Sequence, residues 1–325
     1  MRTIGHFRRL ILIYRVFARR AGPRLLARLV LFSFRRFVLG RRVPLTVMIA
    51  VTGRCQCDCA HCSASGMPGG AELTTDEIRA VISDARRLGV PKIGFTGGEP
   101  LLRGDIVELT AFASGLGLSV SIDTNGLLLN EARARALAEA GISNINVSLD
   151  SPDARRHDRL RRVSGSFAAA LNAVRTCAAW GIPCVVSTYL TDRAMSGGRL
   201  DELIGLARSS GASAVRALFP IYTGKLRGRR RGLLREANKR LFFEKYADPS
   251  FVYSESPLYD YLSGSVECTA RNKMSVYVGA DGSVRTCYTS KKPLGNVRTD
   301  GLAHVLRTGG CLDSGKGPSL ECGVC

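Results

Sequence analysis

Between Val43 and Leu218 the chain alternates short apolar runs with longer amphipathic segments, and this rhythm constrains its fold more than any other feature. A strand, a helix and a further strand form a right-handed unit whose strands are parallel. The predicted strands are Leu45–Val51, Lys92–Phe95, Ser119–Asp123, Asn144–Leu149, Cys184–Thr188 and Ala214–Leu218. The predicted helices are Thr74–Leu88, Asp105–Leu116, Asn130–Ala140, Phe167–Trp180 and Arg199–Ser209. This α/β pattern suits an open, partial (β/α)6 barrel, in which chemistry gathers at the carboxyl ends of the strands.

The chain has 325 residues, enough for one large domain or two smaller ones. Four parts are predicted: a basic amphipathic helical segment (1–42), the barrel (43–220), a basic loop and helical connector (221–265), and a small cysteine-bearing domain (266–325). Eleven cysteines are an odd number, and no signal peptide is visible. Reduced thiols in the cytoplasm, several of them metal ligands, are therefore expected rather than disulfides.

The first 42 residues are strongly basic. No acidic residue precedes Asp58, and the segment carries 12 arginines of a chain whose formal net charge is +20. Gly22-Pro23 divides the segment into two pieces with apolar residues three and four positions apart, as in amphipathic helices. No apolar run is long enough to span a membrane. Three interpretations stay open: contact with a membrane surface, helices packed on the barrel or a partner, and an organellar targeting peptide.

A cysteine-rich loop follows the first predicted strand. Cys55, Cys59 and Cys62 have the spacing C-x3-C-x2-C, which leaves a metal centre one protein ligand short. Three thiolates on a short loop can hold an iron–sulfur cluster and leave the fourth iron open for another ligand. A zinc knuckle that uses Cys57 or His61 is the alternative from this loop alone.

Polar residues end the next three predicted strands. The second ends in Phe95-Thr-Gly-Gly-Glu-Pro100, the third in Asp123-Thr-Asn-Gly126 and the fourth in Ser148-Leu-Asp150. Paired glycines let a ligand approach bare backbone, and Glu99 supplies an anionic acceptor for an ammonium group. These groups are expected to converge on the same edge as the cysteine loop.

With these motifs in this order, the chain resembles the radical S-adenosylmethionine (radical SAM) enzymes between about Thr46 and Leu218. The matching residues are Cys55, Cys59 and Cys62 with His61, Gly97-Gly98-Glu99-Pro100, Thr124-Asn125-Gly126, Ser148-Leu149-Asp150, His157-Asp158, Arg161 and Gly165-Ser166-Phe167. Any one of these pieces is weak, but their joint occurrence is highly specific.

The resemblance implies a [4Fe–4S] cluster on Cys55, Cys59 and Cys62, with SAM chelating the open iron. It also implies SAM contacts on the neighbouring strand ends. The implied contacts are Gly97, Gly98 and Glu99 to the methionine amino group, Ser148 and Asp150 to ribose or carboxylate, Arg161 to the methionine carboxylate, His61 near adenine, and Asn125. The cofactors then supply the radical chemistry, while the protein orients them and excludes water.

Two positions depart from the family pattern. Cys57 stands where cysteine is seldom found, so its thiol is spare or competes as a ligand. Arg162 stands where glycine is frequent. Neither position carries the resemblance.

The C-terminal cysteines form a second group. Cys268, Cys287, Cys322 and Cys325 resemble the shortened SPASM, or twitch, arrangement, in which a β-hairpin and a short helix hold an auxiliary [4Fe–4S] cluster. Four ligands favour electron transfer over direct substrate ligation, and a zinc ribbon is the alternative. Three further cysteines, expected to be core residues or without a partner pattern, are Cys177, Cys184 and Cys311.

The resemblance implies reductive cleavage of SAM to a 5′-deoxyadenosyl radical that abstracts hydrogen from a substrate carbon. An auxiliary cluster favours a net oxidation; a redox-neutral epimerisation or carbon–carbon bond formation is the alternative. A small-molecule, lipid-linked or peptide substrate and an electron donor such as flavodoxin or ferredoxin are expected, in the cytoplasm or peripherally at a membrane. A non-enzymatic metal protein that binds nucleic acid through its arginines is the alternative of another class, and no recognition motif supports it.

Overall fold

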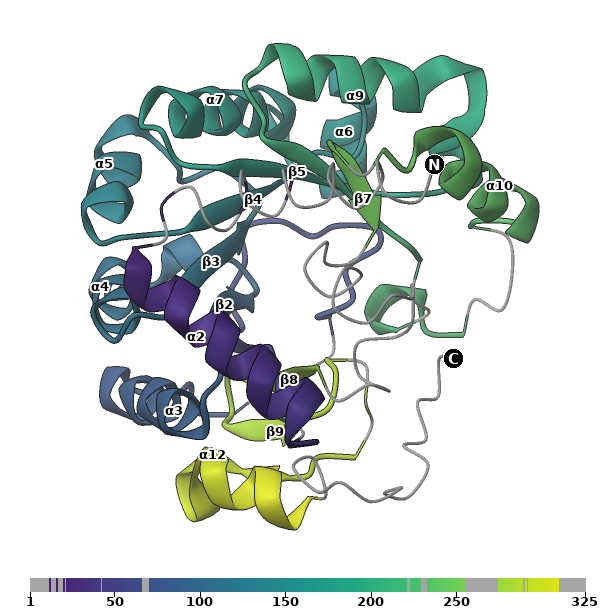
Figure 1. Ribbon diagram of the computed structural model, residues 1–325. Coiled ribbons are helices and arrows are strands. Elements are labelled where there is room, and N and C mark those ends of the chain that lie inside the picture. Colours follow the sequence, from purple (N-terminus) through teal and green to yellow (C-terminus); the bar gives the residue numbers. More distant parts are fainter. Residues whose placement is uncertain are drawn as a thin grey trace.

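The computed structural model describes residues 12, 16, 20, 22–41, 43–65, 70–220, 223–228, 233–248, 250–254, 274–288, 290 and 292–309. Its core is one sheet in the order β10-β9-β8-β1-β2-β3-β4-β5-β6-β7 (Figure 1). The six predicted strands are β1 (Thr46–Thr52), β2 (Lys92–Gly97), β3 (Ser119–Thr124), β4 (Asn144–Ser148), β5 (Cys184–Tyr189) and β6 (Ala214–Leu218). These six pair in sequence order and parallel, so the predicted partial barrel is confirmed.

Four further strands extend the sheet on both sides. They are β7 (Val252–Ser254), β8 (Ser275–Val278), β9 (Ser283–Arg285) and β10 (Gly295–Asn296). β7 pairs parallel with β6, inside the stretch 221–265, for which a loop and helical connector but no strand was predicted. β8 pairs parallel with β1, whereas β9 and β10 are antiparallel. The first strands of the predicted C-terminal domain therefore continue the barrel sheet.

Helices cover the outer face of the sheet (Figure 1). The α-helices of the barrel are α3 (Thr75–Leu88), α4 (Ile106–Gly115), α5 (Glu131–Glu139), α6 (Ala154–Arg161), α7 (Ser166–Ala179), α8 (Asp192–Met195) and α9 (Arg199–Ser209). Single turns of 3-10 helix occur at η3 (Pro100–Leu102), η4 (Ser196–Gly198) and η5 (Gly224–Leu226). The connector forms α10 (Glu236–Leu241) and the π-helical turn η6 (Phe242–Tyr246), as its pattern predicted. The local sequence explains α3 well: Thr74 and Glu77 form a capping box, and Gly89 ends the helix in the left-handed conformation.

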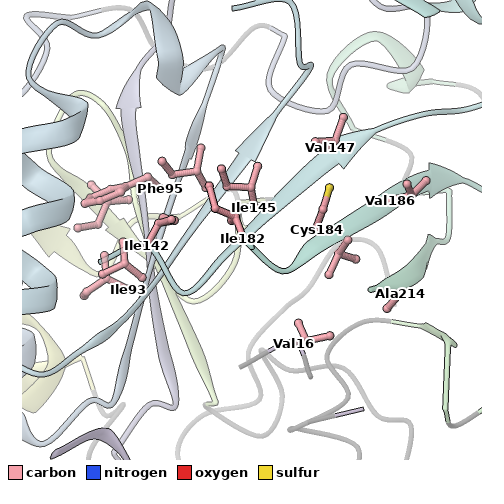
Figure 2. Packing of buried hydrophobic residues seen from close by; sticks show 14 of the residues in the cluster. Val16, Ile93, Phe95, Ile142, Ile145, Val147, Ile182, Cys184, Val186 and Ala214 are labelled. Atoms are coloured by element: carbon pink, nitrogen blue, oxygen red, sulfur yellow. The ribbon is translucent and has the colours of Figure 1, made fainter. Parts of the chain in front are cut away.

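Alternate residues of the strands face opposite sides of the sheet. The outer residues are apolar and pack under the helices, and Figure 2 labels several of them, including Ile93, Phe95, Ile145, Val147 and Val186. The inner face is polar. There, Arg216 of β6 donates to Asp123 of β3 at 2.9 Å and to Ser187 of β5 at 3.1 Å.

The N-terminal segment lies across the end of the barrel where the strands begin. It contains α2 (Pro23–Ser33) and the π-helical turn η2 (Phe34–Val38), with Leu25 and Phe32 buried. Arg28 donates to the carbonyl of Leu116 at 3.1 Å, at the C-terminus of α4, and Arg20 to that of Ala138 at 2.9 Å, in α5. Guanidinium groups are stabilised at helix C-termini because the helix dipole is negative there. Part of the arginine content of residues 1–42 therefore serves packing on the barrel.

The C-terminal part ends, within the described residues, in α12 (Val297–Thr308) beside α3. Arg298 bonds Glu77 at 2.8 Å, and Asp84 accepts the backbone N–H of Ala303 at 3.2 Å. Cys287 follows β9 and is half-buried. The other cysteines of the predicted auxiliary site, Cys268, Cys322 and Cys325, lie outside the described residues, as does Cys311. Cys177 and Cys184 are buried in the core, as expected. In the part of the chain that the structure describes, no helix is both long and apolar enough to cross a membrane.

Candidate active site at the carboxyl ends of the strands

The loop that follows β1 holds all four cysteines of the first motif. Cys59 is buried, Cys57 and Cys62 are half-buried, and Cys55 is exposed. Backbone bonds hold the loop against α6: the Ala60 N–H donates to the Leu160 carbonyl at 2.9 Å. On its other side, the Lys225 N–H donates to the Cys62 carbonyl at 3.0 Å. The loop is thus tied to two residues that lie 100 and 163 positions further along the chain.

The paired glycines bring the end of β2 against this loop. The Gly98 N–H donates to the Thr52 carbonyl at 2.8 Å, and the Glu99 N–H donates to the Arg54 carbonyl at 2.8 Å. A Cβ atom on Gly97 would stand 2.3 Å from the Thr52 oxygen, and one on Gly98 would stand 2.1 Å from the Arg54 oxygen. Glycine is therefore required here by packing against β1 and the loop, beyond any contact with a ligand.

Glu99 joins the ends of β2 and β3. Its side chain is 1% exposed, and it accepts hydrogen bonds from Thr124 Oγ1 at 2.7 Å and from the backbone N–H groups of Asn125 at 2.8 Å and Leu101 at 3.0 Å. Burial raises the pKa of this carboxyl, and the three donors oppose the shift. Sequence reasoning found the residue but not this connecting role. Its predicted contact with the methionine amino group stays a prediction.

Asn125 reaches from β3 back to the cysteine loop. Its Nδ2 lies 3.9 Å from the Cys55 sulfur and 3.3 Å from Gln56 Oε1. Its Oδ1 accepts the Leu127 N–H at 2.9 Å, which fixes the orientation of the amide. An amide donor beside a thiolate ligand tunes the charge on its sulfur.

Asp150, after β4, is the centre of a buried charged group. The side chain is 2% exposed, and its carboxylate lies 2.8 Å from an Arg161 guanidinium nitrogen and 3.4 Å from His61 Nε2. Burial opposes ionisation, but the charges of Arg161 and His61 outweigh it and lower the pKa of Asp150. The Tyr189 N–H donates to the same carboxylate at 3.0 Å, and the Tyr189 ring stacks on His61 with centroids 4.4 Å apart. Tyr189 was not predicted, although its position at the end of β5 was a usable signal.

Two neighbours complete this edge. Ser148 ends β4 and is half-buried. His157 of α6 is 1% exposed, and its Nδ1 accepts the Asp150 N–H at 3.1 Å. Burial lowers the pKa of His157 to about 4, so its ring is neutral near pH 7 and acts as an acceptor. The structure therefore assigns His157 to positioning the Asp150 backbone.

The donor set of the loop suits an iron–sulfur cluster. A hydrogen bond from the Cys57 thiol lowers the pKa of Cys55 to about 7, and the same thiol together with the charge of Arg161 lowers that of Cys59 to about 6. Thiolates are the form that binds metal, so these two shifts favour a cluster, whereas burial raises the pKa of Cys62. Arg161 also lies 3.6 Å from the Cys59 sulfur. Among the described residues, no three His, Cys, Asp or Glu side chains are gathered to hold a single metal ion; a cluster spreads its thiolates over different irons. Cys55, Cys59 and Cys62 would hold it.

Known proteins resemble this chain in the region that contains the candidate site. The sequence matches the family model of the Radical SAM superfamily over residues 49–204. AdoMet-dependent heme synthase of Methanosarcina barkeri is 32% identical over 185 residues, which are 56% of this chain and 52% of that protein. PqqA peptide cyclase of Rhodopseudomonas palustris is 36% identical over 150 residues, which are 46% of this chain and 40% of that protein. The chain thus matches about half, or less, of the length of these relatives.

Solved structures share the fold. SuiB of Streptococcus suis, bound to S-adenosylmethionine, has a TM-score of 0.65 at 16% identity, over 81% of this chain and 65% of SuiB. The protein anSMEcpe, with AdoMet and the Cp18Cys peptide bound, has a TM-score of 0.63 at 18% identity, over 87% of this chain and 89% of its own. The matched residues 49–204 contain the cysteine loop and the four strand ends described above. The chain therefore carries a Radical SAM domain over residues 49–204.

Proposed function

We propose that this protein is a radical SAM enzyme that cleaves SAM reductively and abstracts hydrogen from a substrate carbon. The observation that carries the proposal is the convergence of the cysteine loop, Gly98-Glu99, Asn125 and the Asp150–Arg161 pair on one edge of the barrel. When bound, the [4Fe–4S] cluster supplies the electron that splits SAM into methionine and the 5′-deoxyadenosyl radical.

The residues of the chain have the task of holding the cofactors. Cys55, Cys59 and Cys62 would bind the cluster. Asn125 contacts the Cys55 sulfur, and Arg161 contacts the Cys59 sulfur. These two side chains orient the thiolates and offset their charge. Gly97, Gly98, Glu99, Ser148, Asp150 and Arg161 are the proposed SAM contacts, with the His61 ring, already stacked on Tyr189, near adenine.

A peptide substrate is favoured by the relatives. PqqA peptide cyclase shares 36% identity, and structures of the same fold are described with a precursor peptide (SuiA) and with the Cp18Cys peptide. The heme synthase match supports an iron-tetrapyrrole substrate as the second candidate. We propose a net oxidation assisted by an auxiliary [4Fe–4S] cluster on Cys268, Cys287, Cys322 and Cys325, with a flavodoxin or ferredoxin as electron donor. Epimerisation and carbon–carbon bond formation without net oxidation are the other outcomes.

Anaerobic reconstitution tests the class. Iron and sulfide are counted per chain, and 5′-deoxyadenosine is measured after reduction with SAM present. Two clusters give about eight irons. Serine at Cys55, Cys59 or Cys62 is expected to abolish cleavage, whereas Cys57→Ser, the matched control in the same loop, keeps the cluster and the activity. Bound zinc and no 5′-deoxyadenosine from the unaltered protein would refute the proposal. Mass spectrometry of candidate peptides and iron tetrapyrroles then separates the two substrate classes.

A further inference from the structure

Exposed apolar side chains gather on the N-terminal segment. Of the eight large apolar residues exposed in the described part of the chain, seven lie on α2, η2 and the residue after them. They are Leu26, Val30, Leu31, Phe34, Phe37, Val38 and Leu39, each 46–67% exposed. The opposite side of this segment is anchored by Leu25 and Phe32, which are 6% and 1% exposed. The segment thus buries one apolar face in the barrel and presents a second one outward, as interaction surfaces do.

A basic hollow adjoins this apolar face. A cavity of about 550 Å³ lies between α2 and the C-terminal ends of α3 and α4, lined by Arg24, Arg28 and Arg86 with Leu31 and Leu116 among its apolar walls. Arg28 and Arg86 both donate to the Leu116 carbonyl, at 3.1 and 3.2 Å. Burial, and then the charge of Arg86, lower the pKa of Arg28. The cations are thus close enough to repel one another, and a bound anion would relieve that repulsion.

The surroundings of the hollow keep its positive charge. Residues 1–57 contain no carboxylate side chain. In the last two turns of the neighbouring helices, Asp84 is paired with Arg87, and Glu139 lies 3.9 Å from Arg135. Leu31 belongs both to the hollow and to the exposed apolar face, so the two features form one continuous surface.

We propose that residues 23–39 lie on an anionic phospholipid surface, with a lipid phosphate among Arg24, Arg28 and Arg86. Guanidinium groups match phosphate oxygens with paired hydrogen bonds. The exposed leucine, valine and phenylalanine side chains enter the boundary between head groups and acyl chains, as in interfacial amphipathic helices. The adjacent positive charge selects this occupant over a neutral protein partner. The inference stands independently of the proposed reaction.

Vesicle sedimentation with the full-length protein tests it. The protein is expected to bind vesicles of phosphatidylcholine with phosphatidylglycerol and to bind phosphatidylcholine alone far more weakly. Salt should reduce the binding, because exposed charges are screened. Inorganic phosphate at equal ionic strength should displace no more protein than chloride does. Equal binding to both vesicles, or complete displacement by phosphate alone, would overturn the proposal.

Substitutions locate the surface. Leu26→Gln with Val30→Gln removes two exposed apolar side chains, and Leu241→Gln, at an exposed position on α10, is the matched control. Arg24→Gln with Arg86→Gln should lower the partition coefficient on anionic vesicles about thirtyfold, since each basic residue near such a surface contributes a factor of about five. All variants should remain folded at the temperature of the binding assay. Unchanged vesicle binding by both double variants contradicts the proposal. Equal loss of binding in Leu241→Gln also contradicts it. A third contradicting result is a dimer, seen by light scattering, that dissociates only in the variant Leu26→Gln with Val30→Gln.

Discussion

The pair formed by Asp150 and Arg161 offers a quantitative test of the site. Their side chains are 2% and 12% exposed and 2.8 Å apart. In Asp150→Asn the shape and one acceptor oxygen remain, but the charge of Arg161 loses its partner in the interior. Breaking a buried pair on one side costs about 3–5 kcal/mol, because an uncompensated charge is left behind. The free energy of unfolding of Asp150→Asn should therefore fall by about that amount.

A double-mutant cycle separates this charge effect from lost packing. Arg161→Met removes the cation, and the double variant removes both charges, so it should lose about 2 kcal/mol less than the sum of the single variants. Urea unfolding of identically prepared anaerobic proteins, followed by circular dichroism, gives the four free energies. Glu108→Gln, which breaks an exposed pair with Arg79, is the control and should cost about 0–1 kcal/mol. Additive effects, or a loss below about 1 kcal/mol in Asp150→Asn, would refute the buried-pair reasoning.

Two further predictions concern residues at the carboxyl ends of the strands. In the unfolded chain His157 is protonated near its ordinary pKa of about 6.5, but in the folded chain its pKa is about 4. The free energy of unfolding should therefore fall by up to about 3 kcal/mol as the pH decreases from 6.5 to 4. Urea unfolding measured across this pH range should show no such decrease in His157→Gln. The decrease should remain in His304→Gln, a substitution at an exposed position. Equal pH profiles for the two variants would contradict the prediction. Gly98→Ala places a Cβ 2.1 Å from the Arg54 oxygen and should lower the iron bound after reconstitution at least several-fold, whereas Gly104→Ala, with open space around it, should match the unaltered protein. Equal iron contents would show that the loop tolerates displacement.

The strand–helix rhythm was enough to predict the barrel because each long element repeats one clear period. It failed where elements are short or depend on distant partners. β7 has three residues, Val252–Ser254, and it exists because β6 offers it an edge. α6, with only His157 buried, has no apolar stripe that a period search would find. Local pattern cannot predict pairings of that kind.

The site was predictable as a set of residues but not as a set of contacts. The motif residues gather at one edge because parallel strands end together. Their bonds to one another, such as Glu99 to Thr124 and His157 to the Asp150 backbone, depend on side-chain depth, which a sequence does not encode locally. The glycine pair illustrates the difference. The sequence suggested that the pair lets a ligand approach, whereas in the structure the glycines allow the end of β2 to pack closely against the carbonyls of Thr52 and Arg54.

The position of α2 has a consequence for orientation. Helix α2 crosses the barrel (Figure 1), and its bond to Leu116 lies at the end where the strands begin. The cysteine loop follows the last residue of β1 and so lies at the opposite end. Strands of five to seven residues separate these ends by on the order of 20 Å. A molecule bound to lipid through residues 23–39 would therefore have its cysteine loop on the side that faces away from the membrane, toward the water. Such an orientation suits substrates delivered from the aqueous side, a peptide among them, and puts an acyl chain embedded in the same bilayer out of reach.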